Sequence, residues 1–210
     1  MKWSNDADEL GASKVGAIVM GETPFQTNEA VRQIVLNAKA GVQSIDDGLY
    51  QDAKDRGNYL EPTLTEWASD KLDNLCPDNV VCNYTPPIDA HRIKEMRLCA
   101  SLDGILEVVG GELTIPNPQG DDISVSGFGA LEIKTDGWDD GPPRADQVIQ
   151  LQTQMLCAGF KWGVIAKLGP KLKFTLFPYR LSEKLVGIII EKVAEFWDRV
   201  DRDLPYPPID

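Results

Sequence analysis

The first clear periodic pattern lies between Val31 and Ala38, where apolar residues recur every three or four positions. Thr27 precedes this pattern with a side chain that can cap a helix, and Gly41 follows it as a residue type that commonly ends one. The pattern therefore predicts a first helix from about 28 to 40.

A longer apolar pattern extends from Ile45 to about Leu75, again at near-helical spacing. Pro62 lies inside it and lacks the backbone N–H group that a helix interior needs. We interpret this segment as one bent helix or as two.

The rest of the chain alternates between strand-like and helix-like patterns, after a loop marked by Pro77 and Pro86-Pro87. Strands are predicted at 97–100, 104–109, 123–126, 130–134, 162–166 and 172–177, and helices from about 145 to 158 and from about 182 to 202. This order predicts an α/β protein that forms one domain over 1–210 and ends in an extended, proline-rich tail at 203–210.

Charge and composition narrow the function. The chain has 21 Lys and Arg against 33 Asp and Glu, a formal net charge of −12, which excludes a generally basic nucleic-acid coat. No apolar run approaches the roughly 18 residues of a membrane-spanning helix, and the start at Met1 lacks the apolar core of a signal peptide. We expect a cytoplasmic protein without a membrane segment.

The single histidine, His91, makes Ser-His-Asp hydrolysis and histidine-rich zinc sites poor explanations. The four cysteines contain no C-x-x-C pair, which argues against a zinc ribbon or an iron–sulfur site. We expect four reduced, mostly buried thiols.

Two charged residues interrupt the apolar strand at 130–134. Alternation places Glu132 and Lys134 on one face and Ile133 on the other, so an acid and an amine point together from a buried strand. A Mg²⁺ ion held by Asp103 and Glu132 would resolve this cost, and Lys134 would place a positive charge beside the reacting phosphate. The same acid-x-Lys spacing at Asp52 lies in a polar helical stretch and is interpreted as a solvated face.

Three glutamines, Gln147, Gln150 and Gln154, share one face of the helix predicted at 145–158, whereas Gln152 points elsewhere. The stripe can border the metal site or be a merely solvated surface. Glu61, beside Pro62, can likewise serve the site or be a surface glutamate.

Four short motifs occur in an order that resembles the YqaJ / lambda exonuclease family of viral recombination nucleases, within the PD-(D/E)XK superfamily. They are Gly57-x-x-x-Glu61-Pro62, Ser101-Leu102-Asp103-Gly104, Leu131-Glu132-Ile133-Lys134 and Gln150-Leu151-Gln152. The segment from Gly11 to Gly21, with Ser13 at its third position, also resembles the amino-terminal G-x-S segment of that family. The resemblance spans about residues 10 to 200.

The resemblance implies a restriction-endonuclease-like core, with a central mixed β-sheet flanked by helices. It implies Asp103 and Glu132 as metal ligands, completed by the carbonyl of Ile133, with Lys134 as the catalytic lysine. It also implies Glu61 as a helical carboxylate near the metal and Gln150 as the motif glutamine. The expected cofactor is Mg²⁺, with Mn²⁺ able to replace it.

Two positions depart from the family pattern. Acids at 5–10 stand where members often carry an arginine that grips the 5′-phosphate, and Leu102 stands where they usually have proline. A basic groove for DNA is expected from Lys161, Lys167, Lys171 and Lys173 around the last two strands, together with Ser13, and a second basic group contains Arg92, Lys94 and Arg97. Either basic group can instead be a solvated face.

The main hypothesis is a Mg²⁺-dependent exonuclease that degrades one strand of linear double-stranded DNA, 5′→3′, in phage-type homologous recombination. The resemblance further implies a single-strand annealing protein as partner and a ring-shaped homotrimer. One alternative keeps the fold and makes the protein an endonuclease or repair nuclease. Another treats it as a non-catalytic, acidic protein-binding module in which Glu132 and Lys134 form a buried ion pair.

Overall fold

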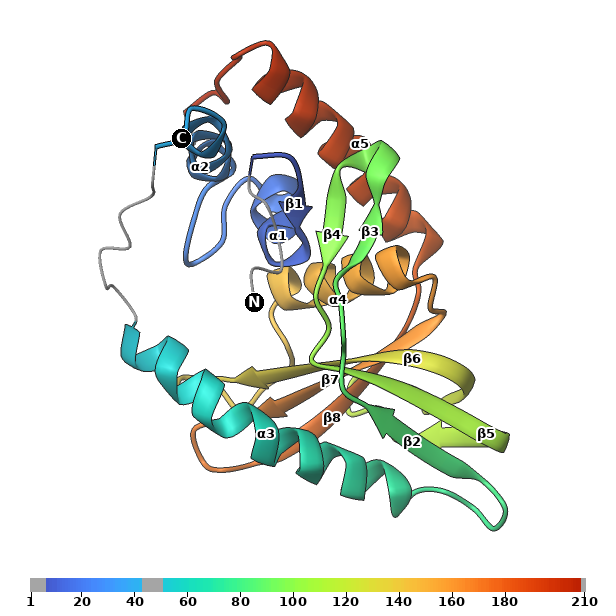
Figure 1. Ribbon diagram of the computed structural model, residues 1–210. Coiled ribbons are helices and arrows are strands. Elements are labelled where there is room, and N and C mark those ends of the chain that lie inside the picture. Colours follow the sequence, from blue (N-terminus) through green and yellow to red (C-terminus); the bar gives the residue numbers. More distant parts are fainter. Residues whose placement is uncertain (1–6, 43–50, 209–210) are drawn as a thin grey trace.

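The computed structural model describes residues 7–42 and 51–208, shown in Figure 1. The elements along the chain are β1 (Leu10–Gly11), α1 (Ala12–Met20), α2 (Asn28–Lys39), α3 (Gln51–Asp73), β2 (Val81–Thr85), β3 (His91–Ile93), the short 3₁₀ helix η1 (Lys94–Met96), β4 (Leu98–Ala100), β5 (Gly104–Ile115), β6 (Ile123–Thr135), α4 (Ala145–Ala158), β7 (Trp162–Leu168), β8 (Phe174–Arg180) and α5 (Glu183–Asp201).

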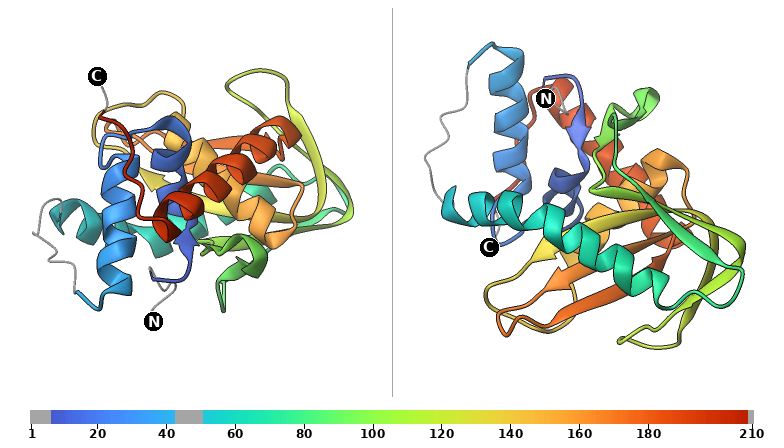
Figure 2. Two further views of the ribbon diagram at one scale, coloured as in Figure 1. Left: turned by 90° about the horizontal axis from the view of Figure 1, so that it is seen from above. Right: turned by 60° about the horizontal axis from the view of Figure 1, so that its bottom comes forward.

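The centre of the fold is a five-stranded sheet in the order β2-β5-β6-β7-β8. The neighbours β6 and β7 run parallel, whereas the other neighbouring pairs run antiparallel, so the sheet is mixed. Helix α3 covers one face of the sheet and α4 covers the other (Figures 1 and 2). The expected α/β class, with a central mixed sheet flanked by helices, is confirmed.

Alternation along β6 determines which residues face which helix. Leu131 and Ile133 pack into the apolar core beneath α3, whereas Ala130 packs against Leu151 of α4. Because successive side chains of a strand point to opposite faces, the next residue on the α4 side is the charged Glu132. The sheet thus presents an acid to the helix that carries the glutamines.

A second layer lies beyond α4. Helices α1, α2, α4 and α5 share an apolar cluster that includes Val15, Val35, Ile149 and Phe196. A small sheet in the order β1-β4-β3 borders this layer, and Figure 1 shows α4 between the central sheet and α1. The chain therefore folds as a sheet with one covering helix below and a helical layer above.

The predicted helix boundaries are largely confirmed. The Thr27 hydroxyl accepts the backbone N–H of Ala30 at 3.1 Å, and Gly41 has a φ of +71°, a backbone conformation that suits glycine after a helix end. The long apolar pattern is one helix with Pro62 inside it; the part of this prediction at 45–50 lies outside the described residues.

Several elements were not predicted. Helix α1 has no cap signal, since no side chain caps its first turn. The segment interpreted as a loop after Pro77 contains the edge strand β2, whose five residues lie between prolines and have only one buried side chain. The segment before Arg97 contains β3, a further strand of three residues.

The β5–β6 hairpin is longer than predicted, and the two strands predicted at 123–126 and 130–134 are one strand, β6. The pairing register shifts between Val108 and Leu113, where Gly110 has a φ of +86°. A Cβ atom at Gly110 would lie 2.1 Å from the carbonyl oxygen of Asn79, so only glycine fits. This irregularity conceals the strand's full length from a period-two pattern.

The carboxy-terminal segment lies against α2 rather than standing free. The backbone N–H of Tyr206 donates to Glu29 at 2.9 Å, and Asp203 forms an ion pair with the buried Arg32. None of the four cysteines, all within the described ranges, forms a disulfide. No helix in the described part of the chain is long and apolar enough to cross a membrane.

Candidate active site

The motif residues of β6 have the predicted orientation. Glu132 and Lys134 form an ion pair on the α4 side of the sheet, whereas Ile133 packs on the α3 side. Glu132 is 2% exposed, so its charge is almost completely removed from water. Such a buried carboxylate requires partners, because an unpaired one would be costly.

Asp103 reaches the same place from the turn that precedes β5. Its backbone N–H donates to the carbonyl of Leu131 at 3.2 Å, and its side chain accepts the backbone N–H of Ile133 at 2.7 Å. These two contacts fix the aspartate against the strand that carries Glu132. Leu102, where the resembled family has proline, is buried in the core beneath α4.

Two glutamines of α4 hold Glu132 from the other side. Gln150 donates to one carboxylate oxygen of Glu132 at 2.6 Å and accepts from Lys134 at 3.1 Å. Gln154 donates to the other carboxylate oxygen at 2.5 Å and to the carbonyl of Ser101 at 2.8 Å. Both oxygens of Glu132 are therefore fixed, and Gln150 also fixes the ammonium group.

The sequence pattern identified Gln154 only as part of a stripe, although it is fully buried and contacts Glu132 directly. Gln147, at the start of the same stripe, is buried and accepts the backbone N–H of Arg144 at 3.0 Å, so it caps α4. A solvated stripe is therefore the wrong interpretation for these two residues.

Gln152 points elsewhere as predicted, toward Arg180 and Ser182.

The electrostatics of the site favour an added positive charge. Burial and the neighbouring Glu132 charge raise the pKa of Asp103 well above its usual range, and the Lys134 charge only partly opposes them. Partial burial and Glu132 also raise the pKa of Glu61. Burial alone would lower the pKa of Lys134, but Glu132 and Asp103 outweigh it and raise that pKa. Three carboxylates thus share one ammonium group.

This charge balance fits a hard divalent cation. Mg²⁺ is commonly held by one or two carboxylates together with waters and phosphate oxygens. Among the described residues, no three acidic, histidine or cysteine side chains form a ready-made cage for a metal ion. Asp103 and Glu132 are the residues that would hold such an ion, with Glu61 near it. The role of the Ile133 carbonyl as a further ligand stays a prediction.

Open space reaches these residues from two sides. A cavity of about 260 Å³ is lined by Asp103, Glu132 and Gln150 together with Ser13, at the start of α1. A second cavity, of about 210 Å³, is lined by Glu61, Lys134 and their neighbours. The site predicted from scattered motifs is therefore one accessible place, and Ser13 belongs to it.

The lysines expected to form a DNA groove do not cluster. Lys161 precedes β7, and Lys171 and Lys173 precede β8, so they lie at opposite ends of a hairpin roughly 20 Å long. Lys167 is not a surface lysine: it is 2% exposed, and its ammonium group pairs with Asp136 at 3.1 Å. The expectation that Lys167 contacts DNA is wrong for this reason.

The two arginines of the second basic group form ion pairs with acids. Arg92 pairs with Glu9 at 2.9 Å, and Arg97 pairs with Asp201 at 2.9 Å while stacking on Trp197. These contacts favour a structural role for the two arginines. The side chains of the second acid-x-Lys pair, at Asp52, lie outside the described residues.

No protein-family model and no curated protein matches the sequence. The fold is similar to that of an alkaline exonuclease, LHK-Exo, from Laribacter hongkongensis, with a TM-score of 0.64 and 18% sequence identity over 94% of this chain and 90% of that one. LHK-Exo in complex with dAMP matches with a TM-score of 0.63 and 18% identity, over 96% of this chain and 93% of that one. At this identity the likeness shows a shared fold.

Proposed function

We propose that this chain is a metal-dependent deoxyribonuclease that degrades one strand of linear double-stranded DNA from its ends. The observation that carries the proposal is the joint placement of Asp103, Glu132 and Lys134 by three different contacts to the same strand and helix. The likeness of the whole fold to an alkaline exonuclease supports the same reaction class.

Lys134 has the properties of a fixed positive charge. Its raised pKa keeps the ammonium group protonated, and Gln150 and Glu132 hold it in place. A protonated lysine can stabilise the negative charge that develops on a phosphate oxygen, but it cannot act as a base. A bound divalent cation would polarise the phosphate and lower the pKa of a bound water.

The start of α1 is placed to orient a phosphate group. No side chain caps the first turn of α1, and Gly11, Ala12 and Ser13 line the cavity that also reaches Glu132. Unpaired N–H groups at a helix start bind anions well, and the Ser13 hydroxyl adds a further donor. These groups support Ser13 as a DNA contact without any arginine nearby in sequence.

The raised pKa values of Asp103 and Glu61 argue against a purely structural ion pair. A buried Glu132–Lys134 pair balances its own charge, so two further acids beside it would only destabilise the fold. A cation site explains why they are there. The non-catalytic, acidic module is therefore the weaker alternative.

Further parts of the proposal go beyond the reaction class. They are a 5′→3′ direction, Mg²⁺ as the metal with Mn²⁺ able to replace it, a place in phage-type homologous recombination beside a single-strand annealing protein, and a ring-shaped homotrimer. The resemblance of the motifs supports these parts. An endonuclease or repair nuclease of the same fold is the alternative, favoured by the acids at 5–10 where the family often has an arginine.

The test is digestion of end-labelled linear DNA beside covalently closed circular DNA, with Mg²⁺ or with EDTA. Wild type should release nucleotides from linear ends with Mg²⁺ alone, Glu132→Ala should release none, and Asp52→Ala, which alters the other acid-x-Lys pair, should behave as wild type. Cutting of closed circles would establish the endonuclease instead. An inert wild type with every divalent metal would refute the proposal.

A further inference from the structure

The segment between β6 and α4 carries Trp138, whose side chain is 95% exposed. It is the most exposed large apolar side chain among the described residues. Trp138 lies a few positions after Lys134 and Thr135 in the chain. These two residues line one of the cavities at the candidate site. Tryptophan is normally well buried, so an indole displayed in solvent beside a candidate active site calls for an explanation.

Buried charges hold the backbone around Trp138. The carboxylate of Asp136 accepts the backbone N–H groups of Trp138 at 2.9 Å and of Asp139 at 3.3 Å. Lys167 pairs with Asp136 and also donates to the carbonyls of Gly141 at 3.1 Å and Pro142 at 3.3 Å. A single buried ion pair thus shapes both ends of the turn.

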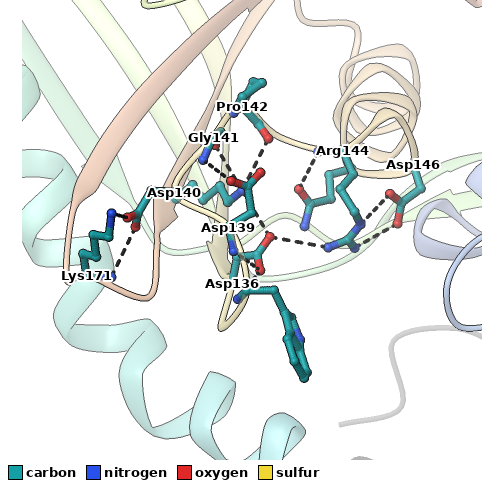
Figure 3. Close-up of polar contacts among 11 residues, drawn as sticks. Asp136, Asp139, Asp140, Gly141, Pro142, Arg144, Asp146 and Lys171 are labelled. Atoms are coloured by element: carbon teal, nitrogen blue, oxygen red, sulfur yellow. Dashed lines mark hydrogen bonds and ion pairs between the residues drawn. The ribbon is translucent and has the colours of Figure 1, made fainter.

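Further contacts fix the second half of the segment, as Figure 3 shows. Asp140 accepts the backbone N–H of Lys171 at 3.3 Å, and a Cβ atom at Gly169 would lie 2.1 Å from an oxygen of Asp140. Arg144 pairs with Asp146 at 3.0 Å and approaches Asp136 at 3.8 Å. The turn is therefore ordered before any ligand arrives, which removes the entropic cost of ordering it on binding.

We propose that the Trp138 indole stacks on an unpaired nucleobase of the DNA strand at the active site. This inference rests on the proposed function and names the form of DNA that the site accepts. Bases stack on exposed aromatic side chains regardless of sequence. Inside a duplex both faces of each base are covered by its neighbours, so Trp138 can engage only a strand end or a single-stranded stretch.

The charges around Trp138 fit a base better than a protein surface. The guanidinium group of Arg56 lies beside Gly137, where a Cβ atom would be 3.6 Å from it, and can face the phosphate that follows the stacked base. Asp139, the next residue in the chain, is exposed and repels phosphates but not a neutral base. A stable protein interface needs about 800 Å² per partner with an apolar centre, and one indole between charged groups does not supply it.

The experiment compares Trp138→Ala and Trp138→Phe with wild type. Tyr59→Ala is the matched control, because Tyr59 is 84% exposed and lies about 160° around α3 from Glu61. Binding of a labelled single-stranded oligonucleotide and of closed circular duplex is measured in EDTA, which prevents digestion. Digestion of linear duplex with Mg²⁺ is measured in parallel.

Trp138→Ala should weaken single-strand binding roughly 5- to 150-fold and leave circular-duplex binding unchanged. Trp138→Phe should retain most of the affinity, Tyr59→Ala should match wild type, and all variants should unfold at the wild-type temperature. Equal single-strand binding by Trp138→Ala and wild type would overturn the inference, while digestion by wild type would leave the proposed function standing.

Two other outcomes also overturn the inference. A change in sedimentation of Trp138→Ala, with unchanged DNA binding, would assign the indole to contact between copies of the chain. A wild type that binds no DNA and digests none would overturn both the inference and the proposed function.

Discussion

Replacing Gln154 by methionine tests whether α4 positions Glu132, the proposed metal ligand. Gln154 is fully buried, and methionine fills nearly the same volume without hydrogen-bonding atoms. The change removes donors to Glu132 at 2.5 Å and to Ser101 at 2.8 Å. Gln152→Met is the matched control, because Gln152 is 2% exposed on the same helix and makes two hydrogen bonds away from the site.

The two substitutions should differ little in stability. Gln154→Met leaves one oxygen of the buried Glu132 without its donor, at about 1–3 kcal/mol. The Arg180 carbonyl and the Ser182 N–H freed by Gln152→Met belong to exposed residues, as does the Ser101 carbonyl freed by Gln154→Met, so water can replace the lost contacts. Gln154→Met also removes the Gln154 carbonyl oxygen, which is buried without a hydrogen-bond partner, and this offsets part of its cost. We expect each variant to lose no more than about 3 kcal/mol.

The two substitutions should differ sharply in metal use. Groups that orient a metal ligand typically change metal affinity or activity by about 10- to 100-fold, so Gln154→Met should raise the half-saturating Mg²⁺ concentration by that factor. Gln152→Met should leave it unchanged. The assay measures the initial rate of digestion of linear duplex DNA across Mg²⁺ concentrations, with urea unfolding in parallel. An equal Mg²⁺ requirement in both variants would refute the positioning role.

Three further outcomes follow from the buried charges. Lys167→Met should cost about 3–5 kcal/mol by urea unfolding, because it leaves Asp136 without its closest cation, and adding Asp136→Asn should recover part of that loss. Metal-free protein should lose thermal stability as pH rises from about 4, because the folded state holds the Asp103 proton to higher pH than the unfolded chain does. Asp103→Asn should flatten this pH dependence and raise the neutral-pH melting temperature while abolishing digestion. Finally, the logarithm of DNA affinity should fall against that of salt concentration with a slope of only about −2 to −3, measured by oligonucleotide binding.

Local patterns predicted the helices other than α1 because their signals are short-range. The Thr27 cap, Gly41 at the end of α2, and the bounds of α4 all depend on residues within a few positions of each other. The shared orientation of Glu132 and Lys134 was predictable for the same reason, since alternation in a strand orients them without knowledge of the partner strands. In these cases the neighbouring residues in the sequence were enough to predict the structure.

The sequence could not show which residues distant in the chain complete the site. Lys167 looks like any lysine in a strand, and only the pairing of β6 with β7 brings it under the turn that holds Asp136. The edge strand β2 is identified by its pairing with β5 rather than by its own composition. Gln154 was visible in a stripe, but its contact with Ser101 depends on how α4 packs on the sheet.

The net charge of −12 becomes compatible with DNA binding once the paired charges are located. Many acids form ion pairs far from the site, such as Glu29 with Arg32 and Asp201 with Lys39. Each such pair also neutralises a basic side chain. Within the described ranges, these pairs leave fewer cations to attract the DNA backbone. On the proposed function, affinity comes from a few local contacts: a divalent cation held by Asp103 and Glu132, the start of α1, and the proposed stacking on Trp138. Because few of these contacts release counterions from DNA, we expect a weak salt dependence, which would distinguish the proposed nuclease from one with a basic groove.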